Sequence, residues 1–94
     1  MIAITRYSVP PDRAGSFAGQ AGAILEELAK SPGYLSGRLG RAADDPELWA
    51  LITEWEGAGY YRRALGTFVV RVILIPLSAL AIDEPGAYEI VVRA

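Results

Sequence analysis

The chain has 94 residues and a mass of 10.1 kDa, which is enough for one small domain and too little for two. Nine Lys and Arg against eleven Asp and Glu give a net charge of −2, and no basic run is interleaved with aromatic residues, so nucleic-acid binding is not expected. The absence of cysteine and histidine excludes disulfides, thiol catalysis, zinc fingers and histidine-ligated haem. We therefore expect a cytoplasmic protein with no metal and no cofactor.

The apolar content is high for so small a chain, with 52% apolar residues and a mean hydropathy of +0.25. A compact monomer of this mass exposes about 5,300 Å². The interior of such a small domain cannot hold all of these apolar residues, so some of them must lie on the surface. We expect a second copy of the chain to cover this apolar surface. The most apolar stretch, residues 68–82, is shorter than the roughly 20 residues that cross a bilayer, and the first residues do not form a signal peptide, so no membrane partner is expected.

The first predicted elements are a strand and a helix. Residues 2–9 are rich in β-branched side chains and predict a strand that ends at two prolines. Apolar residues spaced i, i+3, i+4, i+7 then predict a helix that begins at Pro11 or Asp12 and ends at Ser31. Three glycines lie within this helix, namely Gly15, Gly19 and Gly22. We interpret them as sites where the helix approaches a sheet closely.

A hairpin follows, with strands predicted over 34–43 and 48–56 and a turn at Asp44-Asp45-Pro46. Alternation predicts that the two faces of these strands differ. One face of the first strand carries Leu35, Gly37 and Leu39. One face of the second carries Trp49, Leu51, Thr53 and Trp55.

The last third of the chain is harder to interpret. Residues 57–65 predict a short helix that carries Tyr60 and Tyr61. The β-branched residues of 67–82 favour a strand, and both faces are apolar under either period. We place a helix over 68–75 that breaks at Pro76, followed by a final strand over 87–92.

The order strand, helix, strand, strand, helix, strand predicts an α+β domain of the split βαβ, or ferredoxin-like, class over residues 1–94. Its antiparallel sheet has helices on one face. Thr5 and Tyr7 should lie on that helix-facing side. The opposite face carries Ile4, Ala50 and Ile52, which favours a homodimer that packs sheet against sheet.

Four segments of the chain carry a resemblance to a known family. They are Ser31-Pro32-Gly33-Tyr34, residues 41–46, Glu54-Trp55-Glu56 and residues 83–89. In this order the chain resembles the antibiotic biosynthesis monooxygenase superfamily of dimeric α/β barrel proteins over nearly its whole length. The resemblance implies a homodimer whose sheets form a barrel, with a pocket between the sheet and helices of each subunit. Some members oxygenate phenols such as anthrones without metal or flavin.

The resemblance also extends to single positions. The strand tryptophan of the oxygenases matches Trp55, and an aromatic residue six positions later matches Tyr61. Their asparagine, four positions before the tryptophan, is Leu51 here, and the chain contains no asparagine. The haem-degrading branch requires an axial histidine that the chain lacks.

The catalytic candidates are Trp55, Tyr61 and Arg71, where Trp55 would stack a substrate ring and the other two would stabilise its anion. The expected pocket residues are Thr5, Tyr7, Phe17, Leu51, Thr53 and Tyr60. Each has an alternative explanation in core packing, and Arg71 has one in pairing with a carboxylate. Tyr60 and Tyr61 are about 100° apart on a helix, so both cannot face one pocket. The sequence leaves two functions open: a cofactor-independent monooxygenase of aromatic substrates, and a non-catalytic binding module of the same fold.

Overall fold

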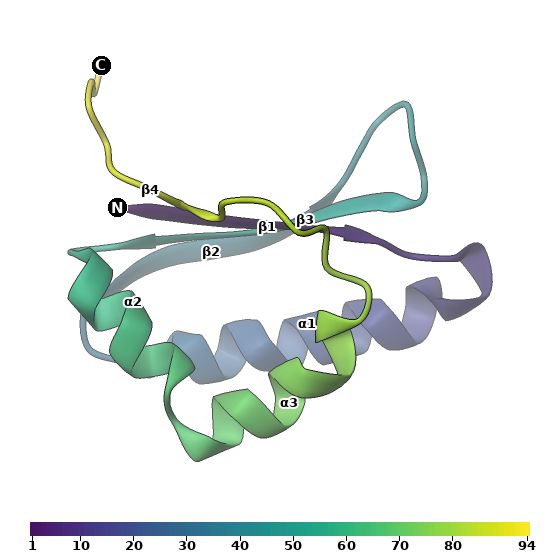
Figure 1. The fold of residues 1–94 in the computed structure, drawn as a ribbon, viewed down its shortest axis with the longest axis horizontal. Helices are drawn as coiled ribbons and strands as arrows, with labels where there is room; N and C mark the ends of the chain where they lie inside the picture. The colour runs from purple at the N-terminus through teal and green to yellow at the C-terminus, as the bar shows by residue number, and fades with distance from the viewer.

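A computed structural model describes residues 1–94 as one sheet with every helix on the same side (Figure 1). The elements are β1 (Ile2–Ser8), a 3-10 turn (Pro11–Arg13), α1 (Ala14–Leu28), β2 (Tyr34–Arg41), β3 (Leu48–Trp55), α2 (Ala58–Leu65), α3 (Phe68–Ser78) and β4 (Ala87–Tyr88). The strands are antiparallel in the order β2-β3-β1-β4. This is the ferredoxin-like α+β arrangement that the element order predicts. No helix combines the length and the hydropathy that a membrane-spanning helix requires.

The register of β1 on β3 decides which side chains enter the core. Thr5 lies opposite Leu51, and Tyr7 lies opposite Trp49, with all four on the helix-facing side. The core lies between this face and the helices. Its buried members are Tyr7, Val9, Phe17, Ala21, Ile24, Leu28, Leu51, Trp55, Ala64, Val70 and Leu77.

The glycines of α1 do not have the role predicted for them. A Cβ added at Gly15, Gly19 or Gly22 would meet no atom within 4 Å, so the prediction of a close helix-to-sheet approach at these positions is wrong. The close approach lies instead on β2. A Cβ at Gly37 would come 2.8 Å from Leu25 Cδ2 and would also overlap the Tyr34 hydroxyl.

A β-bulge at Leu35 changes the faces predicted for β2. Tyr34 pairs with Trp55 while Ser36 pairs with Glu54, so Leu35 has no partner in β3 and is 51% exposed. Alternation had placed Leu35 on the same face as Gly37. The bulge brings Tyr34 to the helix-facing side, where its ring meets Trp55 edge to face at 5.4 Å between centroids.

Helix α3 confirms the helix predicted over 68–75, but it continues past Pro76 to Ser78. A proline this close to the end of a helix removes only one backbone hydrogen bond, the one that would reach the carbonyl of Val72. Leu77 is fully buried and fixes the last turn against the core. The break predicted at Pro76 is therefore wrong.

The last strand is much shorter than the predicted 87–92. Ala87 and Tyr88 pair with Ala3 and Ile2, and residues 89–94 then leave the sheet (Figure 1). Because Tyr88 is already opposite the first residue of β1, the following residues find no further β1 residue to pair with. This segment is highly exposed.

The face of the sheet away from the helices has no cover from the chain itself (Figure 1). Ile4 and Ile52 are cross-strand partners on it, and Arg6 binds Glu84 in a bidentate pair at 2.6 and 2.7 Å. That pair lowers the pKa of Glu84. The chain exposes 5,960 Å², which exceeds the roughly 5,300 Å² of a compact monomer of this mass.

Candidate functional site

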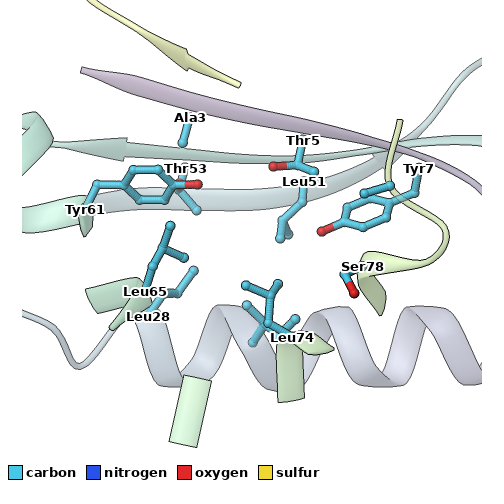
Figure 2. Close-up of a pocket in the computed structure, with 12 residues that line it drawn as sticks. Ala3, Thr5, Tyr7, Leu28, Leu51, Thr53, Tyr61, Leu65, Leu74 and Ser78 are labelled. Atoms are coloured by element: carbon cyan, nitrogen blue, oxygen red, sulfur yellow. The ribbon is translucent and has the colours of Figure 1, made fainter. Parts of the chain in front are cut away.

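A cavity of about 160 Å³ lies between the helix-facing side of the sheet and the helices. Strands β1 and β3 supply one wall, and α1, α2 and α3 supply the other (Figure 2). Most of the lining is apolar, with Leu28, Leu51, Leu65 and Leu74 facing one another across the space. The polar groups in the wall come from Thr5, Tyr7, Thr53, Tyr61 and Ser78.

Three hydroxyl groups point into this space. Figure 2 shows the hydroxyls of Tyr61, Thr5 and Tyr7 directed toward its centre from α2 and β1. The alternation of β1 places Thr5 and Tyr7 on the same face, and Tyr61 reaches them from the first turn of α2.

Burial controls the ionisation of both tyrosines. It raises the pKa of Tyr7 to about 12, with a smaller contribution from the nearby Tyr61. Burial also raises the pKa of Tyr61, and the Thr5 hydroxyl partly offsets that rise. Both phenols are therefore protonated at neutral pH, where each can donate a hydrogen bond to an oxygen atom in the cavity.

Trp55 lies behind the cavity wall. It is 1% exposed, and its Nε1 donates a 2.8 Å hydrogen bond to Thr53 Oγ1. Its ring contacts that of Tyr61, with centroids 5.7 Å apart. This geometry does not support a substrate ring stacked on Trp55, whose ring packs behind Tyr61.

Two further expected pocket residues do not line the cavity. Phe17 is buried between Tyr7 and Trp49, at centroid distances of 5.0 and 5.5 Å. Tyr60 lies over the position where Gly33 would carry a Cβ, and the Arg63 guanidinium stacks on its ring at 4.9 Å. Only Tyr61 of the adjacent tyrosine pair faces the cavity.

Arg71 is exposed on the outer side of α3 and makes no ion pair. The expected ion pair with a carboxylate is therefore not seen, and Arg71 does not line the cavity, so its role toward a substrate anion stays a prediction. Helix α3 is apolar all round, which hides its orientation in the sequence. Burial of Val70 and Leu77 turns Arg71 outward.

Sequence reasoning missed the contribution of α3 to the cavity. Leu74 and Ser78 line it from this helix, and Leu65 lines it from the end of α2. The Ser78 hydroxyl donates to the Ile75 carbonyl at 2.6 Å. The i, i+4 spacing of Leu74 and Ser78 is a usable signal only if the helix is known to pass the proline between them.

The arrangement suits a small apolar molecule that carries a hydrogen-bond acceptor. No Asp, Glu, Lys or Arg lines the cavity, and nowhere in the chain do three or more His, Cys, Asp or Glu residues gather closely enough to hold a metal ion. The apolar side chains can contact the body of such a molecule, and the hydroxyls can donate hydrogen bonds to its oxygen.

Comparison with solved structures identifies the same fold in other proteins. A conserved protein of Methanosarcina mazei Go1 matches at 19% identity with a TM-score of 0.79, over 88% of this chain and 82% of its own. A protein described as an antibiotic biosynthesis monooxygenase matches at 17% identity and a TM-score of 0.75, over 93% of this chain and 92% of its own. A variant of SnoaB, a cofactor-independent oxygenase from Streptomyces nogalater, matches at 23% identity and a TM-score of 0.76, over 86% of this chain and 82% of its own. At these identities the likeness shows the fold alone.

A comparison with curated proteins found no match. The family model described as antibiotic biosynthesis monooxygenase matches residues 1–67, which is well over half of the chain. The matched segment runs from β1 through α2 and so contains the three converging hydroxyls. The chain therefore belongs to the antibiotic biosynthesis monooxygenase family.

Proposed function

We propose that the protein is a cofactor-independent monooxygenase that acts on an aromatic phenol of the anthrone type. The observation that carries this proposal is the convergence of the Thr5, Tyr7 and Tyr61 hydroxyls on an apolar cavity, in a chain of this family. As the substrate loses its proton, negative charge develops on its oxygen. Neutral phenol donors that the protein holds in fixed positions along an apolar wall stabilise such an oxyanion more strongly than mobile water does.

The reaction balances without an external reductant. The methylene of an anthrone becomes a carbonyl, which is a four-electron oxidation, and one O₂ accepts these four electrons. One oxygen atom enters the product, and the other leaves as water with the two methylene hydrogens. The substrate carbanion passes an electron to O₂, and the resulting radicals combine. Since the cavity wall holds no carboxylate or amine, the substrate proton is released to water.

The cavity volume bears on the size of the substrate. An apolar cavity of about 150 Å³ takes a benzene-sized molecule, and the present one is about 160 Å³. One ring therefore fits the structure as it stands. A three-ring anthrone requires Leu65 and Leu74, on α2 and α3, to move outward.

A specific observation favours the second candidate, a non-catalytic binding module. The position of the oxygenase asparagine is Leu51, whose side chain lies in the cavity wall. The wall then offers donors but no amide and no base. Such a cavity can hold an aromatic ligand without promoting its reaction with oxygen.

Oxygen uptake separates the two functions. With a chelator present, we expect anthrone to consume O₂ faster with the protein than without it, and Tyr61→Phe and Tyr7→Phe to lower that rate. Tyr60→Phe is the matched control because it removes the same hydroxyl beside the cavity rather than in its wall. The rate should follow ionisation of the substrate as the pH rises, since no base lines the wall. Quenching of tryptophan fluorescence without O₂ uptake would assign the binding module instead.

The proposed assembly is a homodimer through the open face of the sheet. The open face holds the half-buried cross-strand pair Ile4–Ile52, and the accessible area of the whole chain, 5,960 Å², exceeds the roughly 5,300 Å² of a compact monomer. Light scattering should give twice the mass of the chain for the wild type. Ile52→Glu should give a monomer, and Gln20→Glu, on the exposed side of α1, should remain a dimer. A monomeric wild type at micromolar concentration would contradict this assembly.

A further inference from the structure

Helix α3 has a second apolar side that the cavity does not use. Leu74 and Ser78 line the cavity, and Val70 and Leu77 are buried. The outer side of α3 exposes four large apolar residues to solvent. They are Phe68 (81% exposed), Val69 (49%), Val72 (53%) and Ile75 (69%).

These residues form a continuous stripe. At 100° per residue, Phe68, Val72 and Ile75 lie within about 60° of one another around the helix axis. The buried Val70 and Leu77 lie on the opposite side. Helix α3 lies in the helical layer, on the side of the sheet opposite the open face (Figure 1), so the stripe is separate from the proposed dimer face.

The charged residues of α2, α3 and the segment that follows have one sign. Residues 57–82 contain three arginines, Arg62, Arg63 and Arg71, and no Asp or Glu, in a chain whose net charge is −2. Arg71 lies about 40° from Ile75 around α3 and has no ion-pair partner. Arg62, on α2, is also exposed and without an ion pair.

We propose that the α2–α3 surface, made by the apolar stripe of α3 and the arginines beside it, docks on a membrane surface that contains anionic lipid. An apolar helical side bordered by Arg is the pattern of helices that lie in the headgroup region of a bilayer. The apolar side chains enter the lipid while the guanidinium groups meet the phosphates. Two copies of the α2–α3 surface would instead bring Arg71 against arginines with no acid of this surface to pair them.

This proposal changes the expectation of no membrane partner. That expectation rested on the length of residues 68–82, which limits whether a helix can cross a bilayer. It does not limit a helix of 11 residues that lies parallel to the surface. In the docked position the outer side of α3 would touch lipid while its inner side faces the cavity, which shortens the path of an apolar ligand from the bilayer.

Vesicle sedimentation tests the proposal with matched variants. We expect the wild type to bind vesicles of phosphatidylcholine and phosphatidylserine, to bind phosphatidylcholine alone much more weakly, and to be released by salt. Ile75→Ser should weaken binding to the anionic vesicles by about tenfold or more, because a buried aliphatic side chain is lost. Leu35→Ser removes an exposed apolar side chain from β2 and should leave binding unchanged.

A second pair of variants tests the electrostatic contribution to vesicle binding. Arg71→Gln should weaken binding by about fivefold. Arg13→Gln removes an exposed and unpaired arginine next to α1 and should have little effect. Failure of the wild type to bind anionic vesicles would overturn the proposal, and so would binding that survives both α3 changes. An assembly larger than a dimer that Ile75→Ser dissolves, with no vesicle binding, would assign the α2–α3 surface to a second copy or another protein.

Discussion

The glycines of α1 allow a direct test of the helix environment. Gly19 and Gly22 lie in the helix interior, and a Cβ at either position would meet nothing within 4 Å. Glycine in a helix interior costs about 1 kcal/mol relative to alanine, because more backbone entropy is lost on folding. The double variant Gly19→Ala/Gly22→Ala should therefore raise the free energy of unfolding by about 2 kcal/mol.

Thermal unfolding followed by circular dichroism measures this gain. A domain of this size shifts by about 4–8 °C per kcal/mol, so the Tm should rise by roughly 8–16 °C. Gly37→Ala is the control because its Cβ would come 2.8 Å from Leu25 Cδ2. It should lower the stability by about 1–3 kcal/mol through overpacking.

The reasoning would be refuted if the double variant melted at or below the wild-type temperature. Its new methyl groups would then be meeting atoms of another copy of the chain, and the exposed side of α1 would not be open in the assembled protein. Repeating the measurement at several protein concentrations would identify a contact with another copy, because the Tm of a protein that is stabilised by association depends on its concentration.

Three further predictions follow from buried groups and the open sheet face. Trp55→Phe should destabilise the fold by about 1–2 kcal/mol more than Trp49→Phe in urea denaturation, because Trp55 Nε1 bonds to Thr53 while the buried Trp49 Nε1 has no partner; equal losses would contradict this. The pKa of Tyr7 is raised in the folded state to about 12. The contribution of the neutral Tyr7 side chain to the free energy of unfolding is therefore intact below about pH 10 and is lost as the pH rises to about 12. That loss is about 3 kcal/mol, and Tyr7→Phe should flatten the decline in a pH series of denaturation curves. Ile52→Glu should also lower the Tm of concentrated samples more than that of dilute ones, and a Tm shift independent of concentration would argue against an interface at this face.

The fold was predictable because most elements repeat one simple period. The i, i+3, i+4 spacing of Phe17, Ala21, Ile24 and Leu28 fixed the buried side of α1. Alternation placed Thr5 and Tyr7 on the helix-facing side of β1. Alternation gave the wrong face for Leu35, because a β-bulge adds one residue to the strand and the alternation pattern does not reveal it.

The cavity was less predictable than the fold because part of its wall comes from α3. In that helix nearly every residue is apolar, so the sequence does not show which side faces inward. Arg71 was expected either to pair with a carboxylate or to stabilise a substrate anion, because it interrupts an apolar run. The structure turns it outward, and Ser78 lines the cavity beyond a proline that was expected to end the helix.

Trp55 illustrates a different limit. Alternation gives the face of a strand on which a side chain lies, and it placed Trp55 correctly on the helix-facing side. It does not give the position along that face. Trp55 lies at the end of β3, where Tyr34 and Tyr61 cover it, so its ring contacts side chains rather than open space.

The bulge in β2 also bears on how the protein avoids aggregation. The edge of β1 is occupied by β4 at one end and by backbone hydrogen bonds from residues 80–82 at the other, so β2 provides the free edge of the sheet. A flat free edge would recruit a strand from any neighbouring chain and start a fibre. In β2 the bulge at Leu35 interrupts the regular spacing of edge groups, and Arg38 and Arg41 add like charges that repel a second edge. Both features therefore oppose the pairing of two chains through their β2 edges.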